Sequence, residues 1–141
     1  MGTVHAEITL KNPSDERYAR DGYIKAEDIR TATVTALVDT GTMALVITEE
    51  LRQKLGLGIK AERVVRTANG QRVKCWETEA VEIQWKDRAW PVYAVVIPGA
   101  ENVLLGVIPL EGLDLMVNPV TQELVGAHGD QVEYPLVGVM F

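Results

Sequence analysis

The sequence contains a single cysteine, Cys75, among its 141 residues. One cysteine can form neither an intramolecular disulfide nor a cysteine-rich zinc site. A domain of this length hides about two-thirds of its unfolded surface on folding, so it needs neither feature for stability. We expect Cys75, which lies in a strand-like run, to be a small buried side chain in a protein of a reducing compartment.

Basic residues are also in deficit, with 14 Lys and Arg against 20 Asp and Glu and a formal net charge of -6. Phosphate contacts need a basic surface, so we expect no nucleic-acid partner. No apolar run approaches the roughly 18 residues of a membrane span. The first residues, Met1 to Leu10, lack the basic and then apolar regions of a secretory signal. We therefore expect no membrane partner and a cytoplasmic location.

Histidine is also scarce, and the two histidines, His5 and His128, lie far apart without ligand-like spacing to acids. This pattern predicts no metal site and no cofactor, with both histidines on the surface. Ser14 lies in a polar segment without the strand and turn of a nucleophile elbow, which argues against a serine hydrolase.

The N-terminal third shows two strand patterns. Thr3 to Leu10 alternates between apolar and polar residues, and Ile29 to Val38 is a β-type run that becomes apolar at its end. Polar Lys11 to Gly22 separates them and contains Asn12-Pro13, so we interpret it as a surface loop.

Thr48 predicts the N-cap of a short helix that ends at Gly56. Two strands, Arg63 to Ala68 and Arg72 to Trp85, flank Asn69-Gly70, a dipeptide that tolerates the positive φ angles of a tight turn. The last of these strands turns back into Trp90 to Ile97, which makes a second hairpin.

The C-terminal part predicts a short helix at Val107 to Glu111 and strands at Leu113 to Val117 and Leu136 to Phe141. Many short strands at hairpin spacing, with few helical patterns, indicate an all-β fold, a mostly antiparallel barrel or sandwich. We find neither a repeat nor a linker, so residues 1–141 are expected to form a single domain.

Asp39 follows the apolar residues Ala36-Leu37-Val38 and precedes Thr40 and Gly41. A carboxylate at the end of a buried strand suits a rigid, partly desolvated cleft in which its proton affinity can be tuned. The alternative is a turn aspartate that accepts backbone N–H bonds.

Two further motifs accompany Asp39-Thr40-Gly41: the Asn69-Gly70 hairpin and Leu104-Leu105-Gly106. In their order and rough spacing, the three motifs resemble those of the retropepsin-like aspartic peptidases. The resemblance covers about Val34 to Leu115 and is strongest to the small bacterial members of this group. The resemblance implies a closed β-barrel with one or two short helices that forms a two-fold homodimer.

On this resemblance, Asp39 is the catalytic carboxylate, and each subunit contributes one. Thr40, Gly41 and Thr42 complete the active-site loop, with Thr40 reaching across the dimer interface. Leu104, Leu105 and Gly106 support that loop from below. The flap that closes over a peptide consists of the hairpin residues Ala68, Asn69, Gly70 and Gln71.

The chemistry also requires two chains, because one carboxylate cannot serve at once as base for water and acid for the peptide nitrogen. The predicted activity is an aspartic endopeptidase that cleaves peptide or protein substrates near apolar side chains. Retroviral members carry an Asp and an Arg where Met43 and Val107 stand here. Their charged dimer contacts are therefore not expected in this chain.

Two other interpretations stay open. The chain could be a non-catalytic peptide-binding or dimerisation module on the same barrel, with Trp76, Trp85 and Trp90 lining a surface or filling the core. Near the hairpin lies a basic cluster that would either select acidic peptides or form a solvated face. It comprises Lys60, Arg63, Arg66, Arg72 and Lys74.

Overall fold

The computed structural model describes residues 3–133, which form a mostly β structure with a few short helices. The strands are β1 (His5–Lys11), β2 (Thr31–Val38), β3 (Leu45–Ile47), β4 (Ile59–Arg66), β5 (Arg72–Trp85), β6 (Arg88–Val96), β7 (Leu104–Leu105), β8 (Leu115–Asn118) and β9 (Glu123–Gly126). The helices are α1 (Pro13–Arg20), the 3-10 turn η1 (Ala26–Asp28), α2 (Glu49–Leu55) and α3 (Val107–Gly112). The strand expected at Leu136 to Phe141 lies outside the described residues.

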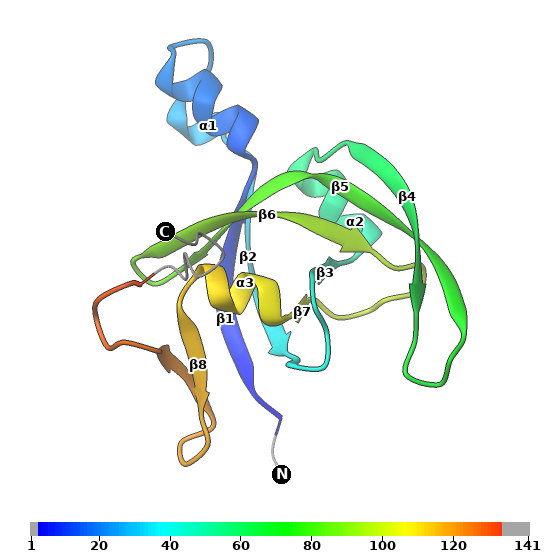
Figure 1. The fold of residues 1–141 in the computed structure, drawn as a ribbon. Helices are drawn as coiled ribbons and strands as arrows, with labels where there is room; N and C mark the ends of the chain where they lie inside the picture. Colours follow the sequence, from blue (N-terminus) through cyan, green and yellow to red (C-terminus); the bar gives the residue numbers. More distant parts are fainter. Residues whose placement is uncertain (1–2, 134–141) are drawn as a thin grey trace, which may run out of the picture.

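Seven strands form one sheet in the order β1-β2-β7-β3-β6-β5-β4, and β1 also pairs with β5 (Figure 1). Most pairings are antiparallel, as expected, but β2 pairs with β7 and β3 with β6 in parallel. Parallel neighbours need long crossover connections, which leave no local signal in the sequence. β8 and β9 form a separate two-stranded sheet.

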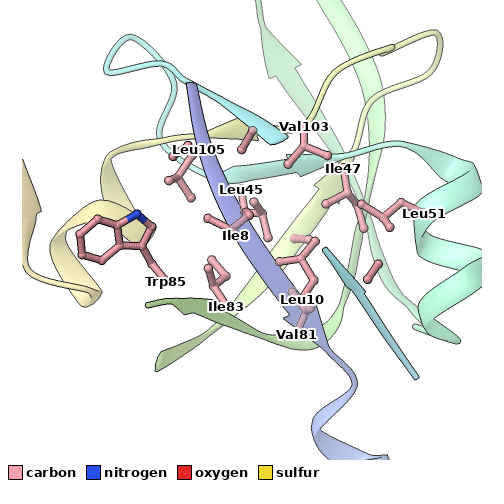
Figure 2. Close-up of a cluster of buried hydrophobic side chains, with 14 of the residues drawn as sticks. Ile8, Leu10, Leu45, Ile47, Leu51, Val81, Ile83, Trp85, Val103 and Leu105 are labelled. Carbon is pink, nitrogen blue, oxygen red and sulfur yellow. The ribbon is translucent and has the colours of Figure 1, made fainter. Parts of the chain in front are cut away.

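The hydrophobic core consists of buried side chains from the large sheet together with others from α2, α3, β8 and β9. On β1 the side chains of Ala6, Ile8 and Leu10 are buried in alternation, which confirms the period-two pattern. Figure 2 shows Ile8 and Leu10 pointing into a cluster with side chains from β3, β5 and β7. Each such side chain contributes roughly 1.5–3 kcal/mol when fully buried. Cys75 is buried, as expected.

The interpretation of Lys11 to Gly22 as a loop is wrong, because the segment contains α1. Asn12 caps this helix, with its Oδ1 accepting from the N–H of Asp15 at 3.1 Å, and Pro13 begins it. Proline at the first helical position loses no hydrogen bond, so Asn-Pro starts a helix here rather than a turn. Asn12 Nδ2 also donates to the C=O of Leu55, at 2.8 Å, and ties α1 to α2.

The other local predictions are mostly confirmed. Thr48 caps α2, and Gly56 ends it in the left-handed conformation. The β4–β5 hairpin forms around Asn69-Gly70, but the turn differs from the expected one, because Gly70 alone takes a positive φ, of 84°. Asn69 acts through its side chain, whose Oδ1 accepts from the N–H of Gln71 at 3.3 Å. Within residues 3–133, no helix is long and apolar enough to cross a membrane.

Candidate active site

The backbone of Asp39 is fixed by two strands distant in sequence. β2 ends at Val38 and pairs in parallel with β7, with Leu37 opposite Leu104 and Val38 opposite Leu105. The N–H of Asp39 extends this ladder by donating to the C=O of Leu105 at 3.0 Å. The aspartate therefore leaves the sheet at a point set by β7.

Both carboxylate oxygens of Asp39 accept hydrogen bonds from the turn that follows. The N–H of Gly41 donates to Oδ1 at 2.9 Å, and the hydroxyl of Thr42 donates to Oδ2 at 2.8 Å. The backbone closes the turn with the N–H of Thr42 on the C=O of Asp39, at 3.1 Å. Oδ1 of Asp39 thus accepts a backbone N–H bond, as in the alternative of a turn aspartate. Oδ2 is held by the side chain of Thr42.

The turn is open to solvent in the isolated chain. Asp39 and Thr42 are half-buried, whereas Thr40 and Gly41 are exposed, and the side chain of Met43 is 64% exposed. The turn therefore presents a carboxylate whose two oxygens are both held by hydrogen bonds.

Leu104, Leu105 and Gly106 lie directly against this turn. Gly106 donates to the C=O of Ala44 at 3.1 Å, and Val107 donates to the C=O of Thr42 at 2.9 Å. A Cβ on Gly106 would lie only 2.4 Å from the oxygen of Ala44 and 2.5 Å from that of Thr42. Only glycine allows this approach of two backbones.

Ala68 to Gln71 form the tip of the β4–β5 hairpin, and all four residues are exposed. In Figure 1 this tip and the turn between β2 and β3 lie at the same, lower end of the molecule. Among residues 3–133, no hydrogen bond joins the tip to the Asp39 turn. The structure thus joins Asp39 to Thr42 and Leu104 to Gly106 through backbone hydrogen bonds, and the hairpin tip does not take part in them.

Most of the basic cluster is engaged by neighbouring side chains. Arg63 approaches Glu77 at 3.3 Å, and Lys74 approaches Glu62 at 3.6 Å. The ammonium of Lys60 lies 3.6 Å from the centre of the Tyr93 ring. These contacts favour a solvated face over a free acid-binding surface.

The tryptophans divide between core and surface. Trp85 is buried in the core, as Figure 2 shows. Trp90 lines a mainly apolar cavity of about 530 Å³, together with Ala44, Tyr93 and Ile108. Ala44, which lines this cavity, follows the Asp39 turn in the sequence. No single sequence motif predicted the cavity.

The part of the chain that the structure describes contains no group of three His, Cys, Asp or Glu side chains that could hold a metal ion. His128 is half-exposed and pairs with Asp114, with 2.8 Å between Nδ1 and Oδ2. Asp114, His128 and the buried Arg88 form a polar cluster that sequence analysis did not predict, because the residues are distant along the chain.

A family model described as "Aspartyl protease" matches residues 25–108, more than half of the chain. The matched stretch contains the Asp39 turn, the β4–β5 hairpin and Gly106. The chain belongs to the aspartyl protease family. No curated protein matches it. The matched residues do not include β1, α1, β8 and β9.

Among solved structures, this aspartyl protease is similar to "EIAV protease complexed with the inhibitor HBY-793". The TM-score is 0.52 at 21% sequence identity, and the match covers 78% of this chain and 85% of that chain. The likeness shows that the fold is retropepsin-like, in agreement with the family.

Proposed function

We propose that this aspartyl protease is an endopeptidase that acts as a homodimer, with two Asp39 carboxylates activating one water molecule. The observation that carries the proposal is the Asp39 carboxylate, held on both oxygens by Gly41 and Thr42 at an exposed turn. Family membership supports the reaction class, and the geometry of the turn supports Asp39 as the catalytic residue.

The reaction needs a second carboxylate, and the sequence has one Asp-Thr-Gly. In the proposed dimer the two Asp39 side chains share one proton. The charged carboxylate takes a proton from the water as its oxygen attacks the peptide carbonyl, and the other donates its proton to the carbonyl oxygen. The protonated carboxylate then gives its proton to the nitrogen as the C–N bond breaks, and one hydroxyl of the tetrahedral intermediate returns its proton to the other carboxylate as the carbonyl re-forms, so the pair again holds one proton.

The exposed part of the Asp39 turn suits a contact between two chains. Thr40 and Gly41 are exposed in the isolated subunit, and a two-fold axis beside them would bring the two Asp39 carboxylates together. In this proposal Thr40 reaches across the interface, and Gly106 supports the turn from within its own subunit. The pairing of β1 with both β2 and β5 supports the closed barrel that the retropepsin resemblance implies.

The proposed substrate is a peptide or protein, bound under the Ala68–Gln71 tip as a flap. The cavity that Ala44 and Ile108 line beside the turn is mainly apolar, which supports a preference for apolar side chains near the cleaved bond. A cytoplasmic location without nucleic-acid or membrane partners remains part of the proposal, on the basis of composition.

The test is Asp39→Asn, which keeps the shape of the side chain but cannot exchange the proton. We expect hydrolysis of a peptide library to be abolished, while far-UV circular dichroism stays that of the parent. Asp87→Asn, in the exposed β5–β6 turn, is the matched control and should keep full turnover. Retained hydrolysis in Asp39→Asn would place the chemistry elsewhere, and a parent that binds peptides without cleaving them would establish the binding-module alternative.

A further inference from the structure

A cluster of four polar residues joins the end of α3 to the last residues that the structure describes. We call it the C-terminal clasp: Arg88, Asp114, His128 and Glu133. Asp114 follows α3 at a φ of 54°, and its carboxylate is 8% exposed. That carboxylate accepts from Nδ1 of His128, at 2.8 and 3.0 Å to its two oxygens, and from the N–H of Glu133 at 3.0 Å.

Arg88 ties the clasp to the backbone of three other positions. It is 7% exposed and donates to the C=O groups of Leu113 and Asp114, at 3.0 and 2.7 Å, and to that of Gly129. The contact between His128 and Asp114 is the part that can respond to pH.

The clasp and the Asp39 turn lie at opposite ends of α3. At its first residues, the N–H groups of Val107 and Ile108 donate to the C=O groups of Thr42 and Met43, each at 2.9 Å. At its other end, α3 runs into Asp114, whose carboxylate and C=O belong to the clasp. A six-residue helix is about 9 Å long, so α3 connects the clasp to the Asp39 turn over a short distance.

The electrostatics set the pH range in which the clasp is closed. The hydrogen bond and charge of Asp114, with Glu133 adding to them, raise the pKa of His128 above its ordinary 6.5, against burial and Arg88. The Glu133 N–H and His128 lower the pKa of Asp114 below 3.8. The stabilisation of the folded state by protonated His128 is therefore complete below pH 6.5 and is lost as the pH rises through the raised pKa of His128. Stabilisation from Asp114 is complete above pH 3.8 and is lost as the pH falls through its lowered pKa.

We propose that the C-terminal clasp is a pH-dependent brace, in which protonated His128 holds α3, and through it the Asp39 turn, in the active arrangement. His128 and Asp114 are positioning residues, since neither touches the Asp39 turn. The clasp is closed in mildly acidic solution, where a shared proton between two Asp39 carboxylates is also expected. The catalytic part of this inference depends on the proposed function, whereas the brace does not.

The first experiment measures the melting temperature of the full-length protein from pH 4 to 9, without reference to activity. His128→Gln keeps a hydrogen-bond donor but no charge, so its melting temperature should be below the parent's at pH 5, and the difference should vanish as the pH rises through the raised pKa of His128. His128→Lys carries a charge to about pH 10 and should extend the stabilisation to higher pH. His5→Gln, at the other histidine, is the matched control and should show no such pattern.

The second experiment follows the hydrolysis of one peptide across the same pH range. In His128→Gln, kcat should fall relative to the parent below the raised pKa of His128 and match it above, while KM changes little. His128→Lys should restore kcat. A parent that does not cleave peptides would refute the proposed function and leave the melting test valid. A difference in melting temperature that is absent at every pH, or equal at pH 5 and 9, would refute the brace.

Discussion

A methyl group added to Gly106 tests how closely α3 and the Asp39 turn must approach. The φ of Gly106 is -89°, which any residue adopts, so Gly106→Ala has no conformational penalty of its own. Its Cβ would instead lie 2.4 Å from the oxygen of Ala44, 2.5 Å from that of Thr42 and 2.8 Å from the carbonyl carbon of Met43. Ordinary contacts of this kind begin at 3.4 Å, so one backbone must retreat by 3.4 minus 2.4, or 1.0 Å.

Such a shift affects both stability and the position of Asp39. Overpacking of this kind typically costs about 1–3 kcal/mol. It also strains the hydrogen bonds from Gly106, Val107 and Ile108 to the turn, each of which contributes roughly 0.5–1.5 kcal/mol. We expect a loss of about 3 kcal/mol in the free energy of unfolding. A displacement of 1 Å near reacting groups can lower turnover by about 100-fold.

The assay combines urea unfolding with kcat/KM per folded chain. Gly22→Ala is the control: its φ of 85° causes strain, but nothing lies within 4 Å of the added Cβ. This variant should lose about 1 kcal/mol of stability and no turnover. A Gly106→Ala protein with parental stability and parental turnover would refute the argument that this contact positions the turn.

Three further predictions concern the proposed site. Thr42→Ala removes the donor to Oδ2 of Asp39 and should move the acidic rate profile to higher pH, measured on one peptide from about pH 3 to 8; a profile that stays in place or moves toward acid contradicts this. Gly70→Val cannot relax at a φ of 84° and should lower turnover more than stability, with Gly22→Val as a control that keeps turnover; an equal loss of both in Gly70→Val would make the hairpin structural. Turnover per chain should fall on dilution below the dimer dissociation constant, and constant turnover where sedimentation shows monomers would exclude the dimeric site.

The parts of the fold that sequence predicts are those with local causes. The alternation of Ala6, Ile8 and Leu10 and the Gly70 turn each determine their element within a few residues. The parallel pairs β2–β7 and β3–β6 have no such local cause, because packing across the whole chain determines which strands become neighbours. The loop predicted around Asn12-Pro13 was wrong for another reason, because the same dipeptide can begin either a turn or a helix.

The candidate site follows the same division. The motifs at Asp39-Thr40-Gly41 and Leu104-Leu105-Gly106 could be located because short stretches of sequence carry them, while the hydrogen bond from the Thr42 hydroxyl to Asp39 is a finding of the structure. The clasp could not be located. Arg88, Asp114 and His128 belong to different segments, and the surroundings that perturb the pKa of His128 exist only after tertiary folding.

The parallel ladder beneath Asp39 has a consequence for how the chain acquires activity. Leu104 lies 67 positions after Leu37, its partner in that ladder, so this pairing closes a long loop and is entropically costly early in folding. The Asp39 turn therefore reaches its final arrangement only after most of the chain has folded. A partly synthesised or partly unfolded chain should be unable to cleave its neighbours, and the protease becomes competent only as a finished domain.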